Sequence, residues 1–103
     1  MGRFVTIAQR GSVPEGSGVE LTVEGRIIAL YRVGEEFFAL DGICPHAGGP
    51  LGQGQLNDCI VTCPWHGWQF DVSTGTHCLN NRLRQTTYAV RIDGDAVQVE
   101  LPE

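Results

Sequence analysis

Two short runs near the middle of the 103-residue chain constrain its fold more than any other feature: Cys44-Pro45-His46 and Cys63-Pro64-Trp65-His66. Each run places one thiol and one imidazole in a short segment that a proline stiffens. Sixteen residues separate His46 from Cys63, and glycines follow both runs closely. Thiolates suit zinc or iron–sulfur clusters, and imidazole binds either. The two runs therefore predict a four-ligand metal site that two facing loops assemble.

The segments on both sides of these runs predict an antiparallel β-scaffold. Apolar and polar residues alternate through residues 19–24, and the Asp93-Gly94 pair is typical of a hairpin turn. We expect strands at residues 4–8, 19–24, 26–33, 37–40, 59–63, 69–72, 87–92 and 96–101. No stretch has helical periodicity. The pattern therefore predicts an all-β fold, an antiparallel β-sandwich or barrel, in a single domain over residues 1–103.

The composition changes between Gly42 and Asn80. This stretch holds seven of the fourteen glycines, three of the five prolines and all three histidines. Ser73-Thr74-Gly75 predicts a turn within it, and residues 80–85 predict a polar connection after it. We therefore expect a smaller, Gly/Pro-rich cluster-binding subdomain at about residues 42–80, carried on a β base formed by residues 1–41 and 81–103.

The charge and hydropathy of the chain exclude some classes of partner and location. Twelve acidic residues and seven arginines give a formal net charge of −5, which argues against a nucleic-acid partner because phosphate must be neutralised by cations. No apolar run approaches the roughly 20 residues of a membrane span, and no secretory signal pattern opens the chain. We expect a cytoplasmic protein with no membrane association.

Three further residues of metal-binding type lie outside the two runs. Cys59 and Cys78 have no histidine at a matching spacing, and we expect them to be packed, reduced thiols. His77 is expected to be a turn or surface residue.

The order of the four donors distinguishes two kinds of metal site. A structural Cys₂His₂ zinc site would use the same residues, but zinc ribbons and fingers usually keep like ligands together. Here each run supplies one sulfur and one nitrogen. A binuclear [2Fe–2S] cluster explains the division, because one iron can take both cysteines and the other both histidines.

These motifs resemble the Rieske family. The similarity covers Cys44-Pro45-His46 and Cys63-Pro64-Trp65-His66-Gly67, and extends through Gly67-Trp68-Gln69-Phe70-Asp71 to Thr74-Gly75. The resemblance implies a Rieske-like fold holding one [2Fe–2S] cluster. It also implies that Cys44 and Cys63 ligate one iron, while His46 and His66 ligate the outer one.

The sequence departs from the respiratory members of that family at four positions. Those proteins join the two loops by a disulfide, but the matching positions here are Gly49 and Trp65. They also hold a serine and a tyrosine whose hydroxyls bond the cluster sulfurs, where this chain has Trp68 and Phe70. Fewer donors stabilise the reduced cluster less, so we expect a potential near the low end of the range of roughly −150 to +300 mV.

The resemblance implies a freestanding ferredoxin, similar to the ferredoxin component of bacterial ring-hydroxylating dioxygenase systems. Its expected partners are a reductase and a terminal oxygenase, bound transiently. No dinucleotide-binding motif and no second histidine pair for a mononuclear iron are seen, so we expect no small-molecule substrate and no catalytic site. The alternatives are the small subunit of a NAD(P)H-dependent nitrite reductase and a zinc-stabilised interaction module.

Overall fold

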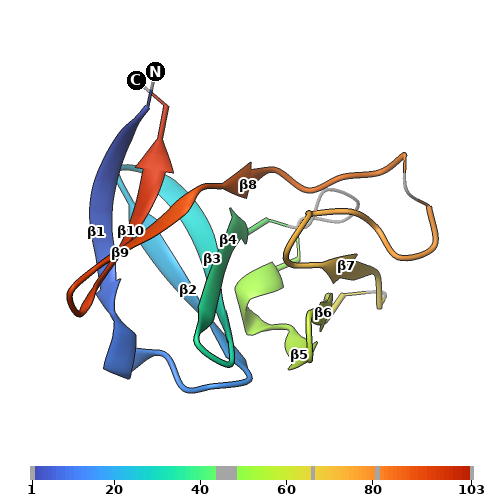
Figure 1. The fold of residues 1–103 in the computed structure, drawn as a ribbon. Helices are drawn as coiled ribbons and strands as arrows, with labels where there is room; N and C mark the ends of the chain where they lie inside the picture. The colour runs from blue at the N-terminus through green and yellow to red at the C-terminus, as the bar shows by residue number, and fades with distance from the viewer. Residues whose placement is uncertain (1, 44–48, 66, 81, 103) are drawn as a thin grey trace.

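The computed structural model describes residues 2–43, 49–65, 67–80 and 82–102 (Figure 1). Within these ranges the strands are Arg3–Gln9 (β1), Ser17–Val23 (β2), Arg26–Val33 (β3), Glu36–Asp41 (β4), Gln55–Asn57 (β5), Ile60–Thr62 (β6), Gln69–Asp71 (β7), Thr87–Tyr88 (β8), Val90–Asp93 (β9) and Ala96–Leu101 (β10). Two single turns of 3₁₀-helix lie at Arg10–Ser12 (η1) and Leu51–Gln53 (η2). No helix among these residues has the length and apolar character needed to cross a membrane.

The described residues form three antiparallel sheets, with strand orders β1-β10-β9, β2-β3-β4-β8 and β5-β6-β7. The four-stranded sheet is the middle layer. Its central strand β3 is buried on both faces, which explains its nearly continuous apolar sequence. Ile28 and Leu30 face one core, whereas Ala29 and Tyr31 face the other. The all-β, antiparallel prediction is therefore confirmed.

The first core lies between the middle sheet and β1-β10-β9, where the first and last strands, β1 and β10, pair next to each other (Figure 1). The inward positions of β10 alternate regularly, and Val97, Val99 and Leu101 are at most 1% exposed. This core holds the two ends of the chain together as one base.

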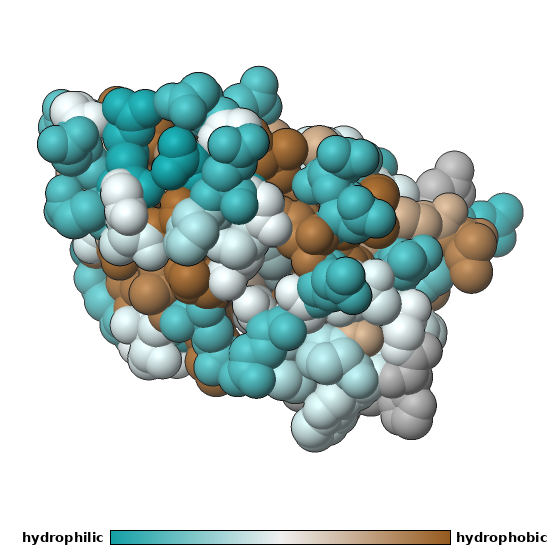
Figure 2. Space-filling view, turned by 90° about the horizontal axis from the view of Figure 1, so that it is seen from below, coloured by the Kyte–Doolittle hydropathy of each residue, from teal (hydrophilic) through white to brown (hydrophobic). Residues whose placement is uncertain are grey.

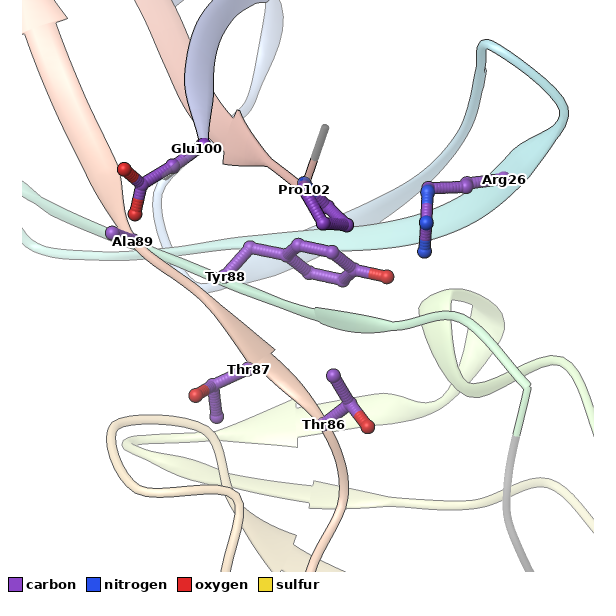
Figure 3. A pocket seen from close by; sticks show the side chains of 8 residues that line it. Arg26, Thr86, Thr87, Tyr88, Ala89, Glu100 and Pro102 are labelled. Atoms are coloured by element: carbon purple, nitrogen blue, oxygen red, sulfur yellow. The ribbon is translucent and has the colours of Figure 1, made fainter.

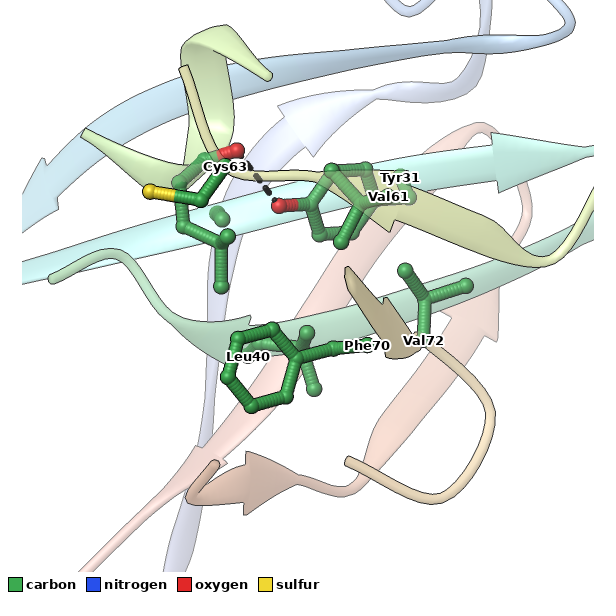
Figure 4. Packing of buried hydrophobic residues seen from close by; sticks show 8 residues of the cluster. Tyr31, Leu40, Val61, Cys63, Phe70 and Val72 are labelled. Carbon is green, nitrogen blue, oxygen red and sulfur yellow. Dashed lines mark hydrogen bonds between the residues drawn. The ribbon is translucent and has the colours of Figure 1, made fainter. Parts of the chain in front are cut away.

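The second core joins the middle sheet to β5-β6-β7. Figure 4 shows Tyr31 and Leu40 of the middle sheet facing Val61 and Phe70 of the small sheet. Cys63 belongs to the same buried cluster. The second core therefore fixes the loop that carries Cys63 against the base.

The strand expected at residues 87–92 is divided in the structure. Thr87–Tyr88 pairs with β4 in the middle sheet, whereas Val90–Asp93 pairs with β10 in the base sheet. Ala89 lies at the crossing, where its carbonyl accepts the Glu100 amide at 2.9 Å. One apolar run of the sequence thus contributes strands to two sheets. Hydrophobic periodicity does not reveal this division of the expected strand.

The strand Gln55–Asn57 was not expected, because its only apolar residue is Leu56. It pairs with β6 through a tight turn in which Asp58 has a φ of +53°. Asp is among the few residues that tolerate this left-handed conformation. The strand predicted at residues 59–63 consequently starts at Ile60 and ends at Thr62.

A buried hydroxyl links the middle sheet to η2. Tyr31 donates to the Leu51 carbonyl at 2.8 Å, and its side chain is fully buried. Tyr31→Phe removes this bond and is expected to lower the free energy of unfolding by about 1 kcal/mol. Thermal denaturation should show a decrease of about 4–8 °C in Tm.

Tyr88→Phe is the matched control for this prediction. Figure 3 shows the Tyr88 hydroxyl directed toward Arg26 in a surface pocket of about 330 Å³, rather than into a core. Its loss should change Tm by less than about 2 °C. Equal decreases for the two variants would contradict the role assigned to Tyr31.

Candidate metal centre

Cys63 is the one predicted ligand among the residues that the structure describes. It directly follows β6, is 1% exposed, and its amide donates to the Trp68 carbonyl at 2.7 Å. Cys44, His46 and His66, the other three predicted ligands, lie outside the described residues. The ligand set of four therefore stays a prediction.

Backbone hydrogen bonds close the bases of both ligand-bearing loops. Ile43 and Pro50 form a bridge beneath the first loop, and the adjoining Leu51 amide donates to the Gly42 carbonyl at 2.9 Å. The second loop connects β6 to β7, where Thr62 pairs with Gln69. Each predicted ligand run is thus held between fixed segments of backbone.

The two loops meet at Gly49. A Cβ atom added at Gly49 would lie 2.9 Å from Cys63 Sγ and 3.0 Å from Trp65 Cβ. Only glycine leaves this approach free of collision. Gly49, three residues after the first run, is therefore close to the buried sulfur of the second run. This arrangement, together with a donor set of two thiols and two imidazoles, fits a Rieske-type cluster.

Gly49 and Trp65 lie in contact where a disulfide between the two loops is missing. These are the positions at which respiratory Rieske proteins are expected to hold their disulfide, and here neither residue has a sulfur. Trp65 instead covers Gly49 while remaining 50% exposed. Packing of Trp65 against Gly49 therefore brings the two loops together where no covalent bond joins them.

Gly49→Val is expected to disturb the site through the sulfur of Cys63. The added side chain overlaps Cys63 Sγ, and we expect the iron content of the purified protein to fall by at least half. Iron analysis and visible absorption measure the effect. Gly11→Val is the control, since nothing lies within 4 Å of a Cβ at that position. Normal iron content in the Gly49 variant would contradict the close approach.

Gln85 is a supporting residue that the sequence reasoning missed. It was expected in a polar connection, yet it is only 7% exposed. Its side-chain amide donates to the carbonyls of Asp41 and Ile43 at 2.8 and 2.6 Å, and its backbone amide donates to Gly75. Gln85 therefore supports the start of the first loop. A lone glutamine carries no sequence signal for this role.

The expectation for His77 was wrong, because this side chain is 93% buried, with 7% of its surface exposed. Its ring stands nearly perpendicular to those of Trp68 and Phe70, with centroids 4.6 and 5.3 Å away. Its Nδ1 accepts the backbone amides of Leu79 and Asn80 at 3.1 and 3.2 Å. His77 thus anchors the β7–β8 connection to the second ligand loop.

The two remaining cysteines differ from each other. Cys59 is half-buried and packs against the second core, as expected for a packed thiol, whereas Cys78 is exposed. Although Cys78 is exposed, the protein displaces some water from its thiol, and this desolvation, followed by the nearby charge of Asp71, raises the pKa of the thiol. A raised pKa disfavours the thiolate, which is the form that binds metals.

An antiparallel β-scaffold in which Gly49 of one loop packs against a buried cysteine of the next is the architecture expected of a cluster-binding β domain. Residues 3–92 match the Rieske [2Fe-2S] domain family. The chain therefore belongs to the Rieske family.

Named relatives agree with this assignment. The ferredoxin component of the naphthalene 1,2-dioxygenase system of Pseudomonas aeruginosa is 38% identical over 90 residues, 86% of each chain. The 3-phenylpropionate/cinnamic acid dioxygenase ferredoxin subunit of Escherichia coli K12 is 37% identical over 93 residues, which cover 88% of this chain and 87% of the relative.

Solved structures are similar over nearly the whole chain. A ferredoxin of Sphingomonas yanoikuyae B1 superimposes with a TM-score of 0.88 at 30% identity, covering 97% of this chain and all of that one. A chain from a complex of oxygenase and ferredoxin in carbazole 1,9a-dioxygenase gives 0.87 at 25% identity, covering 94% and 92%. A NADH-dependent nitrite reductase small subunit of Mycobacterium tuberculosis gives 0.90 at 20% identity, covering 100% and 98%, a likeness of fold alone.

Proposed function

We propose that this chain is a low-potential Rieske ferredoxin that carries single electrons from a reductase to a terminal oxygenase, one of the ring-hydroxylating dioxygenase class. The observation that carries the proposal is the convergence of the two ligand loops on Cys63, in a chain whose relatives are dioxygenase ferredoxins. A dioxygenase partner is favoured over a nitrite reductase, since identities of 37–38% exceed the 20% of the nitrite reductase subunit.

In this proposal Cys44 and Cys63 hold one iron of a single [2Fe–2S] cluster, and His46 and His66 hold the other. The cluster, when bound, accepts and releases one electron. Cys63 lies in the apolar second core, so the protein keeps water from that side of the site. The cluster-binding part is assigned to about residues 42–80, and the base to residues 1–41 and 81–103.

The residues beside the site support a low potential. Phe70 is fully buried in the second core, to which Cys63 also belongs, and Trp68 packs against that core. Neither side chain carries the hydroxyl that respiratory Rieske proteins are expected to direct at the sulfurs. A hydrogen bond worth about 1 kcal/mol more in the reduced state corresponds to about 40 mV for one electron. Two missing bonds therefore favour the low end of the Rieske range.

The proposal gives the chain no catalytic site of its own and places it in the cytoplasm, where its partners would work. No dinucleotide motif accompanies the ligand loops. Reduction of substrate or oxygen is therefore assigned to the partner.

Reconstitution tests the carrier function. The purified holoprotein is combined with NADH, the reductase and the terminal oxygenase of its host, and dihydroxylation of an aromatic substrate is followed. We expect product formation to require the chain and to stop with Cys63→Ser. An oxygenase that turns over at the same rate without the chain would contradict the carrier function.

A further inference from the structure

A groove runs beside the second ligand loop. Its volume is about 360 Å³, and its lining includes Gly67 and Trp68 of the second ligand loop and Leu79 and Leu83 of the β7–β8 connection. His77 also lines the groove. Gly67 and Trp68 follow the proposed ligand His66 directly in the chain. A molecule bound in this groove would therefore lie against the loop that is proposed to carry the outer iron.

Two leucines at the groove are exposed. Leu79 is 90% exposed and Leu83 is 38% exposed. Figure 2 shows hydrophobic surface at the end of the molecule formed by the β7–β8 connection, with hydrophilic residues next to it. Exposed apolar side chains that gather at one site are typical of an interaction surface.

Hydrogen bonds tie the backbone of both leucines to His77. The Leu79 amide donates to His77 Nδ1 at 3.1 Å, and the His77 amide donates to the Leu83 carbonyl at 2.9 Å. Both leucines are thus presented by backbone that is fixed to a buried histidine. A preorganised loop loses little conformational entropy when a partner binds.

The charge around the groove differs from that of the rest of the chain. Residues 42–85 contain two aspartates and two arginines, so the net charge of −5 resides entirely in residues 1–41 and 86–103. Both arginines, Arg82 and Arg84, are exposed on the β7–β8 connection. Among the described residues neither forms an ion pair, whereas Arg3, Arg10 and Arg32 all do.

We propose that this groove is the docking site of the redox partner, and that the partner presents an apolar side chain flanked by carboxylates. The leucines and Trp68 bury the apolar side chain, and Arg82 and Arg84 face the carboxylates. A carboxylate-bearing partner repels the acidic residues of the β base. The electrostatic field of the whole chain therefore orients the protein with its groove toward that partner. This inference rests on the proposed carrier function and adds the chemistry of the partner's face.

The test uses a defined surface with that chemistry. The holoprotein is studied by voltammetry on gold coated with a mixed carboxylate- and methyl-terminated alkanethiol monolayer, and the interfacial electron-transfer rate is measured. R82E/R84E is expected to lower the rate by about tenfold at low salt, and added salt should reduce the difference. Leu83→Ser should lower it about threefold.

Matched variants on the base separate docking from general effects. R26E/R91E changes the total charge by the same amount as R82E/R84E, and Ile92→Ser alters a side chain of similar exposure, 40% against 38% for Leu83. Both controls should stay within about twofold of the wild type. Equal losses in the test and control variants would overturn the docking site, as would an equal wild-type rate on an amine-terminated monolayer.

The electron paramagnetic resonance signal distinguishes a failure of the carrier function from a failure of the docking site. A wild-type protein without a Rieske signal overturns the carrier function itself. A wild-type protein with the signal, but with a rate that is the same in test and control variants, overturns only the docking site.

Discussion

Cys63→Ser is expected to yield a protein without an iron–sulfur cluster. Cys63 is the described member of the proposed ligand set, and its sulfur lies where the two loops meet. Serine offers a hard, protonated oxygen in place of a soft thiolate and binds iron poorly in a buried position. The visible absorption should disappear, and iron should fall to the background of the measurement.

The same variant should also be less stable, because a bound cluster that only the folded state can hold contributes to folding. Cys59→Ser is the control. Cys59 is half-buried in the neighbouring part of the second core, so it reports the effect of a serine there without loss of a proposed ligand. Retention of a full cluster by Cys63→Ser, or an equal loss in Cys59→Ser, would contradict the ligand assignment.

Phe70→Ala is expected to be the most destabilising single change in the second core. Phe70 is fully buried between the middle sheet and β5-β6-β7 and contacts the ring of His77. Truncation of such a side chain costs about 3–5 kcal/mol. Chemical denaturation of the holoprotein should show this decrease in the free energy of unfolding, and Tm should fall by more than about 12 °C.

Phe4→Ala provides the comparison on the opposite sheet. Phe4 is half-buried on β1 and stacks against the Arg91 guanidinium at 4.2 Å. Its truncation should cost about 1 kcal/mol. If the two variants lost the same stability, the second core would not be the element that joins the ligand loops to the base.

The scaffold was largely predictable because its strands follow simple periods. The alternation at 19–24 and the Asp93-Gly94 turn predicted β2 and the β9–β10 hairpin correctly, within a few residues at each end. The same reasoning failed at Ala89, where one apolar run changes sheet. Tertiary packing decides which sheet a strand joins, and the hydrophobic periodicity of a short segment does not report that packing.

The types of the proposed metal ligands could be predicted from the sequence. The residues that hold the ligand loops in place were harder to predict. Metal ligands have distinctive residue types and spacings, so Cys44, His46, Cys63 and His66 could be proposed at once. His77 and Gln85 act through backbone contacts with residues distant in sequence or through ring packing. No pattern of residue types marks such a role. Each was therefore assigned to the surface or to a loop, although both are buried.

The redox character of the chain can be measured by a redox titration of the purified protein, followed by electron paramagnetic resonance. We expect a Rieske-type signal that appears on reduction by one electron, with a midpoint near the low end of the range of about −150 to +300 mV. A colourless, signal-free protein that contains zinc would contradict the cluster. A midpoint well above zero would contradict the low-potential assignment drawn from Trp68 and Phe70.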